Sequence, residues 1–256
     1  MISSSQNSKI KLIRSLMGRP KERREANAFV VEGVRLVEEA AINNWGFQFA
    51  LYDGSLSERG KLQIEGLRSH GVDVEEVSTS MMKVISETET PQGIVAVLNF
   101  NQLPIPEFAN FILIPDQIRD PGNLGTLLRT AAATRVQAVL IPPETTDVFA
   151  PKVLRSGMGA HFRLPIHIMD WAEIEKLTKG LQVYIAEMNG QSCWETDLRQ
   201  PLALIIGSEA EGASESARRV SSAKIAIPMT GSMESLNAGV AGSVLMFEVV
   251  RQRSLV

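Results

Sequence analysis

The feature that most constrains the fold is the alternation of short apolar runs with helix-like segments along nearly the whole chain. Apolar runs such as those at 28–33, 111–117 and 202–209 are separated by stretches in which apolar residues recur at helical spacing. Strands that alternate with helices in this way are typical of parallel α/β proteins. We therefore predict an α/β fold.

One segment, 101–110, interrupts this alternation. Its Pro104 and Pro106 stand in a polar setting that stops regular structure. We expect an N-terminal domain over 1–100, a linker over 101–110 and a second domain over 111–256. Six predicted strands with helices between them give the second domain the pattern of a doubly wound parallel sheet.

Composition excludes several classes of protein. The chain of 256 residues is 44% apolar, and no apolar run approaches the ~20 residues of a membrane helix. Its N-terminus lacks the pattern of a secretory signal, so we expect a cytoplasmic protein. One cysteine and three histidines make a Cys/His zinc cage implausible, and we expect no metal site. Cys193 could be a nucleophile, but with no histidine near it in the sequence a structural role is favoured.

The N-terminal segment is basic although the net charge of the chain is -3. Such a segment can lie along a phosphate backbone, and a solvated helix with a charged outer face explains it equally well. Residues 1–30 carry Lys9, Lys11, Arg14, Arg19, Lys21, Arg23 and Arg24 against Glu22 and Glu25, which is +7 and -2, or +5.

The loop after the strand at 111–117 is the first candidate site. It reads IRDPGNLGTLLRTAAA and has neither the glycine fingerprint of a dinucleotide fold nor the lysine of a P-loop. Gly122 and Gly125 keep the start of the following helix free of side chains. Asn123 and Arg129 are either functional groups or a helix cap and a surface arginine.

Two further glycine-rich loops follow later strands. Gly207 and Glu209 stand at the end of the apolar run at 202–209, and Gly212 follows it, at the sheet edge where ligands of open α/β folds bind. The strand at 223–229 leads into TGSMESLN and a closing helix that is poor in large side chains. Segments with so few large side chains allow either a ligand or another backbone segment to approach them closely.

In their order these three loops resemble the three motifs of the TrmH/SpoU family of RNA ribose 2′-O-methyltransferases, within the SPOUT class. The resemblance covers about residues 111 to 252, and FVVEGVRLVEEA near the N-terminus is similar to the substrate-binding domain of the rRNA-modifying members. It implies a deep trefoil knot, a rare exception to the rule that chains do not knot. Threading through the knot would explain the small residues Gly239, Ala241, Gly242 and Ser243 of the closing helix.

The resemblance also implies a cofactor and a set of site residues. S-adenosylmethionine would lie in the knot, with Leu236 and Ile227 flanking its adenine and Gly207 allowing close approach to the main chain. The other cofactor residues implied are Ile206, Met229 and Met188. The catalytic residues implied are Arg129, Asn123, Glu209, Ser235 and Asn237, with Arg129 clamping a phosphate and stabilising the developing alkoxide, and Glu209 orienting Arg129 or the ribose.

The partners implied are RNA, with ribosomal RNA preferred to tRNA because of the extra N-terminal domain, and a second copy of the chain packed through the knotted domain. Three alternatives stay open: a tRNA ribose methyltransferase, a SPOUT enzyme that methylates a base, and an RNA-binding protein of this fold without transfer activity.

Overall fold

The computed structural model of the chain describes residues 1–209, 211–231 and 235–254. The chain forms two compact units, one of Met1–Asn101 with Phe149–Phe162 and one of Gln102–Val148 with Arg163–Val256. The segment 149–162, which the sequence places in the second domain, therefore packs with the first. Within the described ranges, no helix is long and apolar enough to cross a membrane.

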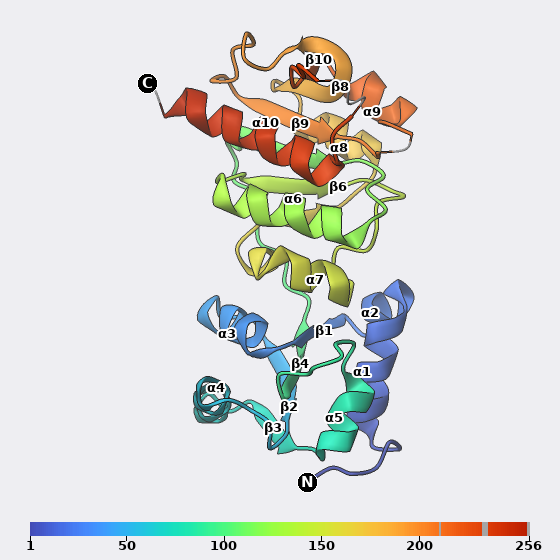
Figure 1. Ribbon diagram of the computed structural model, residues 1–256, viewed down its shortest axis with the longest axis vertical. Coiled ribbons are helices and arrows are strands. Elements are labelled where there is room, and N and C mark those ends of the chain that lie inside the picture. The colour runs from blue at the N-terminus through green and yellow to red at the C-terminus, as the bar shows by residue number, and fades with distance from the viewer. Residues whose placement is uncertain (210, 232–234, 255–256) are drawn as a thin grey trace. The chain divides into compact units, whose positions relative to one another are not determined.

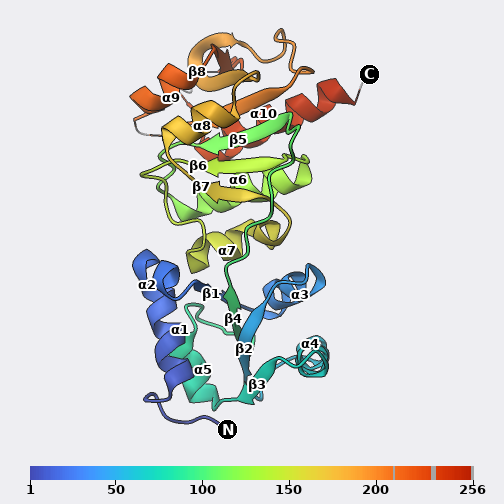
Figure 2. The same cartoon turned by 180° about the vertical axis from the view of Figure 1, so that it is seen from behind.

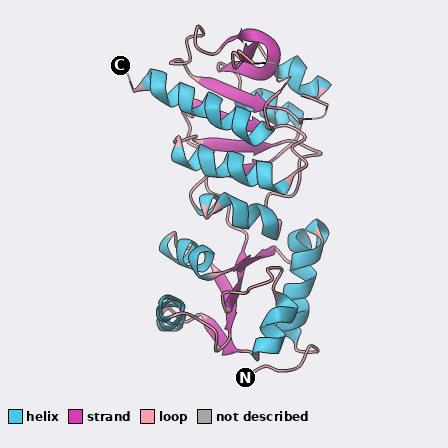
Figure 3. Ribbon diagram, viewed as in Figure 1, coloured by secondary structure: helices cyan, strands magenta, loops and turns pink. Residues whose placement is uncertain are grey.

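The first unit is a four-stranded sheet with helices on both faces (Figure 3). Its central strand β4 runs antiparallel to β1 and β2, while β2 and β3 are parallel. The sequence predicted parallel pairing, but a strand buried on both faces gives the same apolar run whatever its direction. The strands lie in the order β1 (Ala28–Glu32), β4 (Ile94–Asn99), β2 (Phe47–Tyr52) and β3 (Asp73–Glu76). The helices are α1 (Ser8–Gly18), α2 (Pro20–Glu25), α3 (Val34–Ile42), α4 (Glu58–Ser69) and α5 (Thr79–Ile85).

Aromatic packing ties the segment 149–162 to this unit. The ring of Phe29 on β1 lies 5.0 Å from that of Phe149, and Trp45 lies 5.2 Å from Phe162. The indole of Trp45 also donates a hydrogen bond to the Phe162 carbonyl at 3.3 Å. The segment holds helix α7 (Pro151–Gly157), which starts at a proline as helices often do, and the 3₁₀ turn η1 (Ala160–Phe162).

The second unit confirms the predicted parallel sheet. Helices α6 and α10 cover one face, seen in Figure 1, and α8 and α9 cover the other, seen in Figure 2. The strand order is β10, β8, β9, β5, β6, β7, with every named pair parallel. The strands are β5 (Phe111–Pro115), β6 (Ala138–Ile141), β7 (Ile166–Ile168), β8 (Gln182–Ser192), β9 (Leu202–Ile206) and β10 (Ala223–Ala226). The helices are α6 (Pro121–Ala133), α8 (Trp171–Leu177), α9 (Glu215–Val220) and α10 (Ala238–Arg253). The threading of a knot stays a prediction.

Strand β8 contains an arch that the sequence does not reveal. Lys224 of β10 is paired with Ile185, but the next residue, Ile225, is paired with Gln191. Residues 186–190 therefore leave the regular ladder. Gly190 lets the arch return, because a Cβ there would lie 2.6 Å from the backbone of Ile225.

The small residues of α10 are explained by its packing on α6 and β9. A Cβ on Gly242 would lie 2.3 Å from a methyl of Leu127 and 3.2 Å from Ile206. The hydroxyl of Ser243 meets that of Thr130 on α6 at 2.8 Å. The small side chains of α10 therefore allow it to pack closely against α6.

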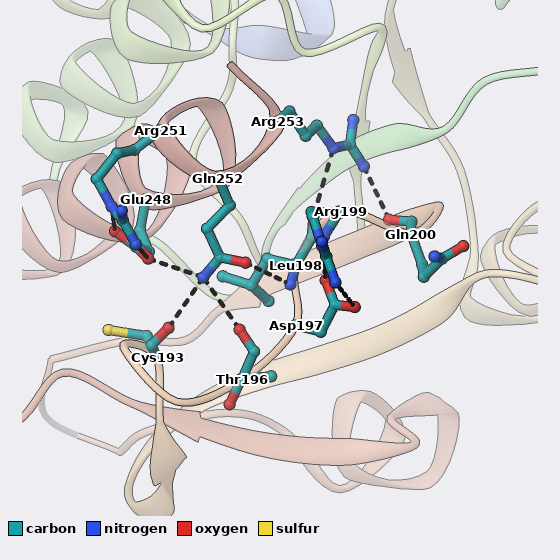
Figure 4. Close-up of polar contacts among 10 residues, drawn as sticks. All are labelled: Cys193, Thr196, Asp197, Leu198, Arg199, Gln200, Glu248, Arg251, Gln252 and Arg253. Atoms are coloured by element: carbon teal, nitrogen blue, oxygen red, sulfur yellow. Dashed lines mark hydrogen bonds and ion pairs between the residues drawn. The ribbon is translucent and has the colours of Figure 1, made fainter. Parts of the chain in front are cut away.

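The last turn of α10 is fixed by polar side chains to the segment 193–200 (Figure 4). The Gln252 amide donates to the Thr196 carbonyl at 3.0 Å and accepts from the Leu198 N–H at 2.8 Å. Cys193, beneath this turn, is fully buried, and burial together with the charge of Glu248 raises the pKa of its thiol to about 11. The thiol is therefore protonated near neutral pH, which supports the structural role.

We expect the Gly242→Leu variant to lose about 1–3 kcal/mol or more of unfolding free energy, because overpacking forces neighbours to move. Thermal denaturation measures the loss. Val240→Leu is the matched control, since Val240 on the same helix is 47% exposed. Equal melting temperatures for the two variants would contradict the packing explanation.

Candidate active site

A cavity of about 580 Å³ opens between the arch of β8 and the carboxyl ends of β9 and β10. Carboxyl ends of parallel strands are the usual ligand site of open α/β sheets, and this volume is that of a small-molecule site. The six residues implied as cofactor contacts all line it: Met188, Ile206, Gly207, Ile227, Met229 and Leu236. The structure thus brings together three loops that are separate in the sequence.

The close return of the backbone after β9 requires a glycine at position 207. A Cβ on it would lie 2.6 Å from the N atom of Ala213. The chain returns so closely because Ser208 and Gly212 exchange two backbone hydrogen bonds, of 2.9 and 3.0 Å, with Gly212 at φ +71°. The glycine therefore allows the loop to fold back, which is a different reason from the cofactor approach that the sequence suggested.

A polar network lies beside the cavity and joins the three loops. The Asn123 amide donates to Glu209 Oε1 at 2.8 Å, and the Asn237 amide donates both to the same oxygen and to Asn123 Oδ1. The N–H of Ala238, at the start of α10, also donates to Glu209 Oε1, at 2.9 Å. A carboxylate at a helix N-terminus is stabilised by the helix dipole.

Asn123 is not the cap of α6. That role belongs to Asp120, whose carboxylate accepts from the Asn123 N–H at 2.8 Å. The side chain of Asn123 is therefore available to bond Glu209 and Asn237.

The other two predicted catalytic residues lie outside this network. Ser235 lines the cavity, and residues 232–234 of the predicted loop before it lie outside the described residues. Arg129 is exposed on α6 and, over the described part of the chain, has no hydrogen-bonding or ionic partner. The suggested pairing of Glu209 with Arg129 is thus absent, and Glu209 binds the two asparagines instead.

Asp116 is a supporting residue that the sequence analysis missed. It is fully buried at the end of β5, and its carboxylate accepts from the N–H of Ser214 at 2.6 Å and from the hydroxyl at 3.2 Å. These bonds hold the far end of the loop that carries Glu209. An acid directly after the apolar run FILIP was the available signal.

Burial raises the pKa of Asp116, opposed by the hydrogen bonds from Ser214. The folded protein then binds this proton more tightly than the unfolded chain, so its contribution to stability falls as pH rises above the unfolded pKa. We expect the unfolding free energy of wild type, relative to Asp116→Asn, to decrease between pH 4 and neutrality. Urea titrations across this range measure it, and a pH-independent difference would contradict the assignment.

Comparison with known proteins agrees with this geometry. Residues 110–247 match the SpoU rRNA Methylase family, and residues 7–96 match the MRM3-like substrate binding domain. The 23S rRNA (guanosine(2553)-2′-O)-methyltransferase RlmP of Bacillus subtilis is 32% identical, over 97% of this chain and 98% of its own. The 23S rRNA (uridine(2479)-2′-O)-methyltransferase of Streptomyces viridochromogenes is 31% identical, over 98% and 92%.

A solved structure aligns with nearly the whole chain. The SpoU methyltransferase AviRb from Streptomyces viridochromogenes, crystallised with the cofactor AdoMet, aligns with a TM-score of 0.86 at 27% identity, over 98% of this chain and 100% of its own. Fold and site together define an α/β methyltransferase with its ligand cavity at the strand ends. The chain belongs to the SpoU rRNA methylase family.

Proposed function

We propose that the protein transfers the methyl group of S-adenosylmethionine to a ribose 2′-hydroxyl of 23S-type ribosomal RNA, in the cytoplasm. The observation that carries the proposal is the network of Asn123, Glu209 and Asn237 beside the cavity. Ribosomal RNA is favoured over tRNA because AviRb aligns over 98% of the chain, whereas a TrmH/SpoU tRNA modifying enzyme of A. aeolicus aligns over 57%.

The residues present fit the cofactor. Ile206, Ile227 and Leu236 give the cavity apolar walls for an adenine. Glu209, whose bonds to described residues all use Oε1, keeps Oε2 for a positively charged ligand. S-adenosylmethionine supplies an electrophilic methyl group on a sulfonium.

The protein's own residues orient the nucleophile and stabilise its charge. A guanidinium stays protonated, so Arg129 serves as a clamp for an RNA phosphate and for the developing alkoxide rather than as a base. Asn123 and Asn237 hold Glu209 in place, and Ser235 offers a hydroxyl at the cavity wall. The absence of any partner for Arg129 among the described residues leaves it available to RNA.

We expect ribose methylation at one or a few rRNA positions to vanish in cells that lack this protein and to return with wild type. Arg129→Ala should restore little, because losing one stabilising donor costs about 10²–10³ in kcat. Alkaline-resistant linkages mapped across the RNA measure both effects. Arg219→Ala, at an exposed arginine of α9, is the control.

Each rival function gives a different result in this experiment. A change in base methylation with unaltered riboses indicates a base methyltransferase, and a ribose change confined to tRNA indicates that substrate. An unchanged methylation pattern, with no cofactor binding in isothermal titration, indicates a silent RNA-binding protein.

We propose that the N-terminal unit binds the RNA. Fewer basic residues of its segment 1–30 are available for this in the structure than the sequence suggests. Lys9 forms ion pairs with Asp73 and Glu75, and Arg23 is buried with its guanidinium on the Leu16 carbonyl. Helix α1 also belongs to the core, so deletion of 1–30 would unfold the unit. Within residues 1–30, the exposed basic residues without a partner among the described residues are Lys11, Arg14, Arg19 and Arg24.

We expect Lys11→Gln/Arg14→Gln to weaken RNA binding and to lower its salt slope by about 1 per lost phosphate contact. Filter binding at several salt concentrations measures both. Lys176→Gln/Lys179→Gln, which removes the same charge from the region of α8 in the second unit, is the control. Equal losses of RNA affinity in the two variants would indicate that segment 1–30 is only a solvated helix with a charged outer face.

We propose that the second unit pairs with a second copy through the outer face of α10. Phe247 is 53% exposed and Trp194 is 49% exposed beside an apolar hollow that Val244 also lines. Exposed apolar side chains gathered in this way mark an interface. We expect Phe247→Glu to be monomeric in analytical ultracentrifugation, while Leu177→Glu on α8 keeps the wild-type mass. A wild-type chain that is already monomeric would contradict the proposal.

A further inference from the structure

Three charged side chains meet at the side of the cavity formed by β8, α9 and β10. Glu187 lies in the arch of β8, with Oε1 2.8 Å from Arg218 Nη2 and Oε2 2.7 Å from Lys224 Nζ. All three residues line the cavity. We call this set the charged triad.

The triad has binding capacity beyond its internal ion pairs. The Glu187 side chain is 13% exposed, whereas those of Arg218 and Lys224 are 45% and 48% exposed. A guanidinium has five N–H donors and an ammonium three, so both cations keep donors for a further acceptor. Glu187 Oε1 is buried and lacks a hydrogen bond of good geometry despite its nearness to Arg218.

The charges suit one particular chemical group. Two cations around one carboxylate leave a net charge of +1, which attracts a carboxylate, and the carboxylate of Glu187 attracts an ammonium. A free α-amino acid carries both groups on one carbon. Apolar Ile206 and Ile227 line the same cavity, and Glu209, with its asparagine network, borders it from the β9 and α10 side.

We propose that the charged triad recognises the amino-acid end of the cofactor: Arg218 and Lys224 bind its α-carboxylate and Glu187 binds its α-ammonium. The inference rests on the proposed assignment of this cavity to S-adenosylmethionine. It adds a specificity determinant that distinguishes the full cofactor from its adenosine portion.

Two unreactive probes separate the amino-acid end from the rest. S-adenosylhomocysteine carries that end, and 5′-methylthioadenosine has the same adenosine and thioether without it. Isothermal titration of the full chain gives the affinity of each. The test variant Glu187→Gln/Arg218→Gln/Lys224→Gln neutralises the whole triad, so no charge is left buried without its partner.

We expect the triple variant to bind S-adenosylhomocysteine about 10- to 100-fold more weakly, as loss of charge-assisted hydrogen bonds predicts, and to bind 5′-methylthioadenosine within about twofold of wild type by the same measure. Lys224→Gln alone, at a half-exposed side chain, should give a smaller loss with the same selectivity. Arg219 lies on the same helix as Arg218 but does not line the cavity, so Arg219→Gln should change the affinity for neither probe.

Parallel loss of both probes would overturn the inference, because the triad would then only hold the arch in shape. Unchanged binding of both would overturn it as well. If wild type binds neither probe, the assignment of the cavity fails and the inference fails with it. Retained 5′-methylthioadenosine binding also shows that the variant is folded.

Discussion

The candidate site depends on the hydrogen bonds that the carboxylate of Glu209 accepts. This carboxylate accepts hydrogen bonds from Asn123, 86 residues away in sequence, from Asn237, 28 residues away, and from the first N–H of α10. These donors can meet only when β9, α6 and α10 are in place on the sheet. Because one oxygen joins three loops, the site is complete only in the folded chain.

Glycines set how closely these segments approach. Gly207, Gly190 and Gly242 each occupy a position where a Cβ would lie under 3 Å from atoms of the chain itself. Of the three, Gly207 lines the cavity, where the chain folds back on itself. Gly18 and Gly54, by contrast, face open space, so a glycine in the sequence does not by itself indicate such a crossing.

Charge is where sequence and structure differ most. The sequence counts seven basic residues in 1–30, but Lys9 is neutralised by acids of β3 and Arg23 is buried. Conversely, Glu187, Arg218 and Lys224 carry no mutual signal in the sequence, yet they form one cluster. The partner of a charged side chain depends on packing between distant segments, which neither periodicity nor composition encodes.

The sequence by itself determined the alternation of strands and helices and the parallel sheet of the second unit, because apolar periodicity and glycine loops are local properties. Its resemblance to a known family pointed to six of the residues that line the cavity. The sequence did not determine that 149–162 packs on Phe29 and Trp45, that β4 runs antiparallel, or that residues 186–190 form an arch. Those features result from contacts between segments far apart in the chain. Only the tertiary structure decides them, since the same local pattern is compatible with several such contacts.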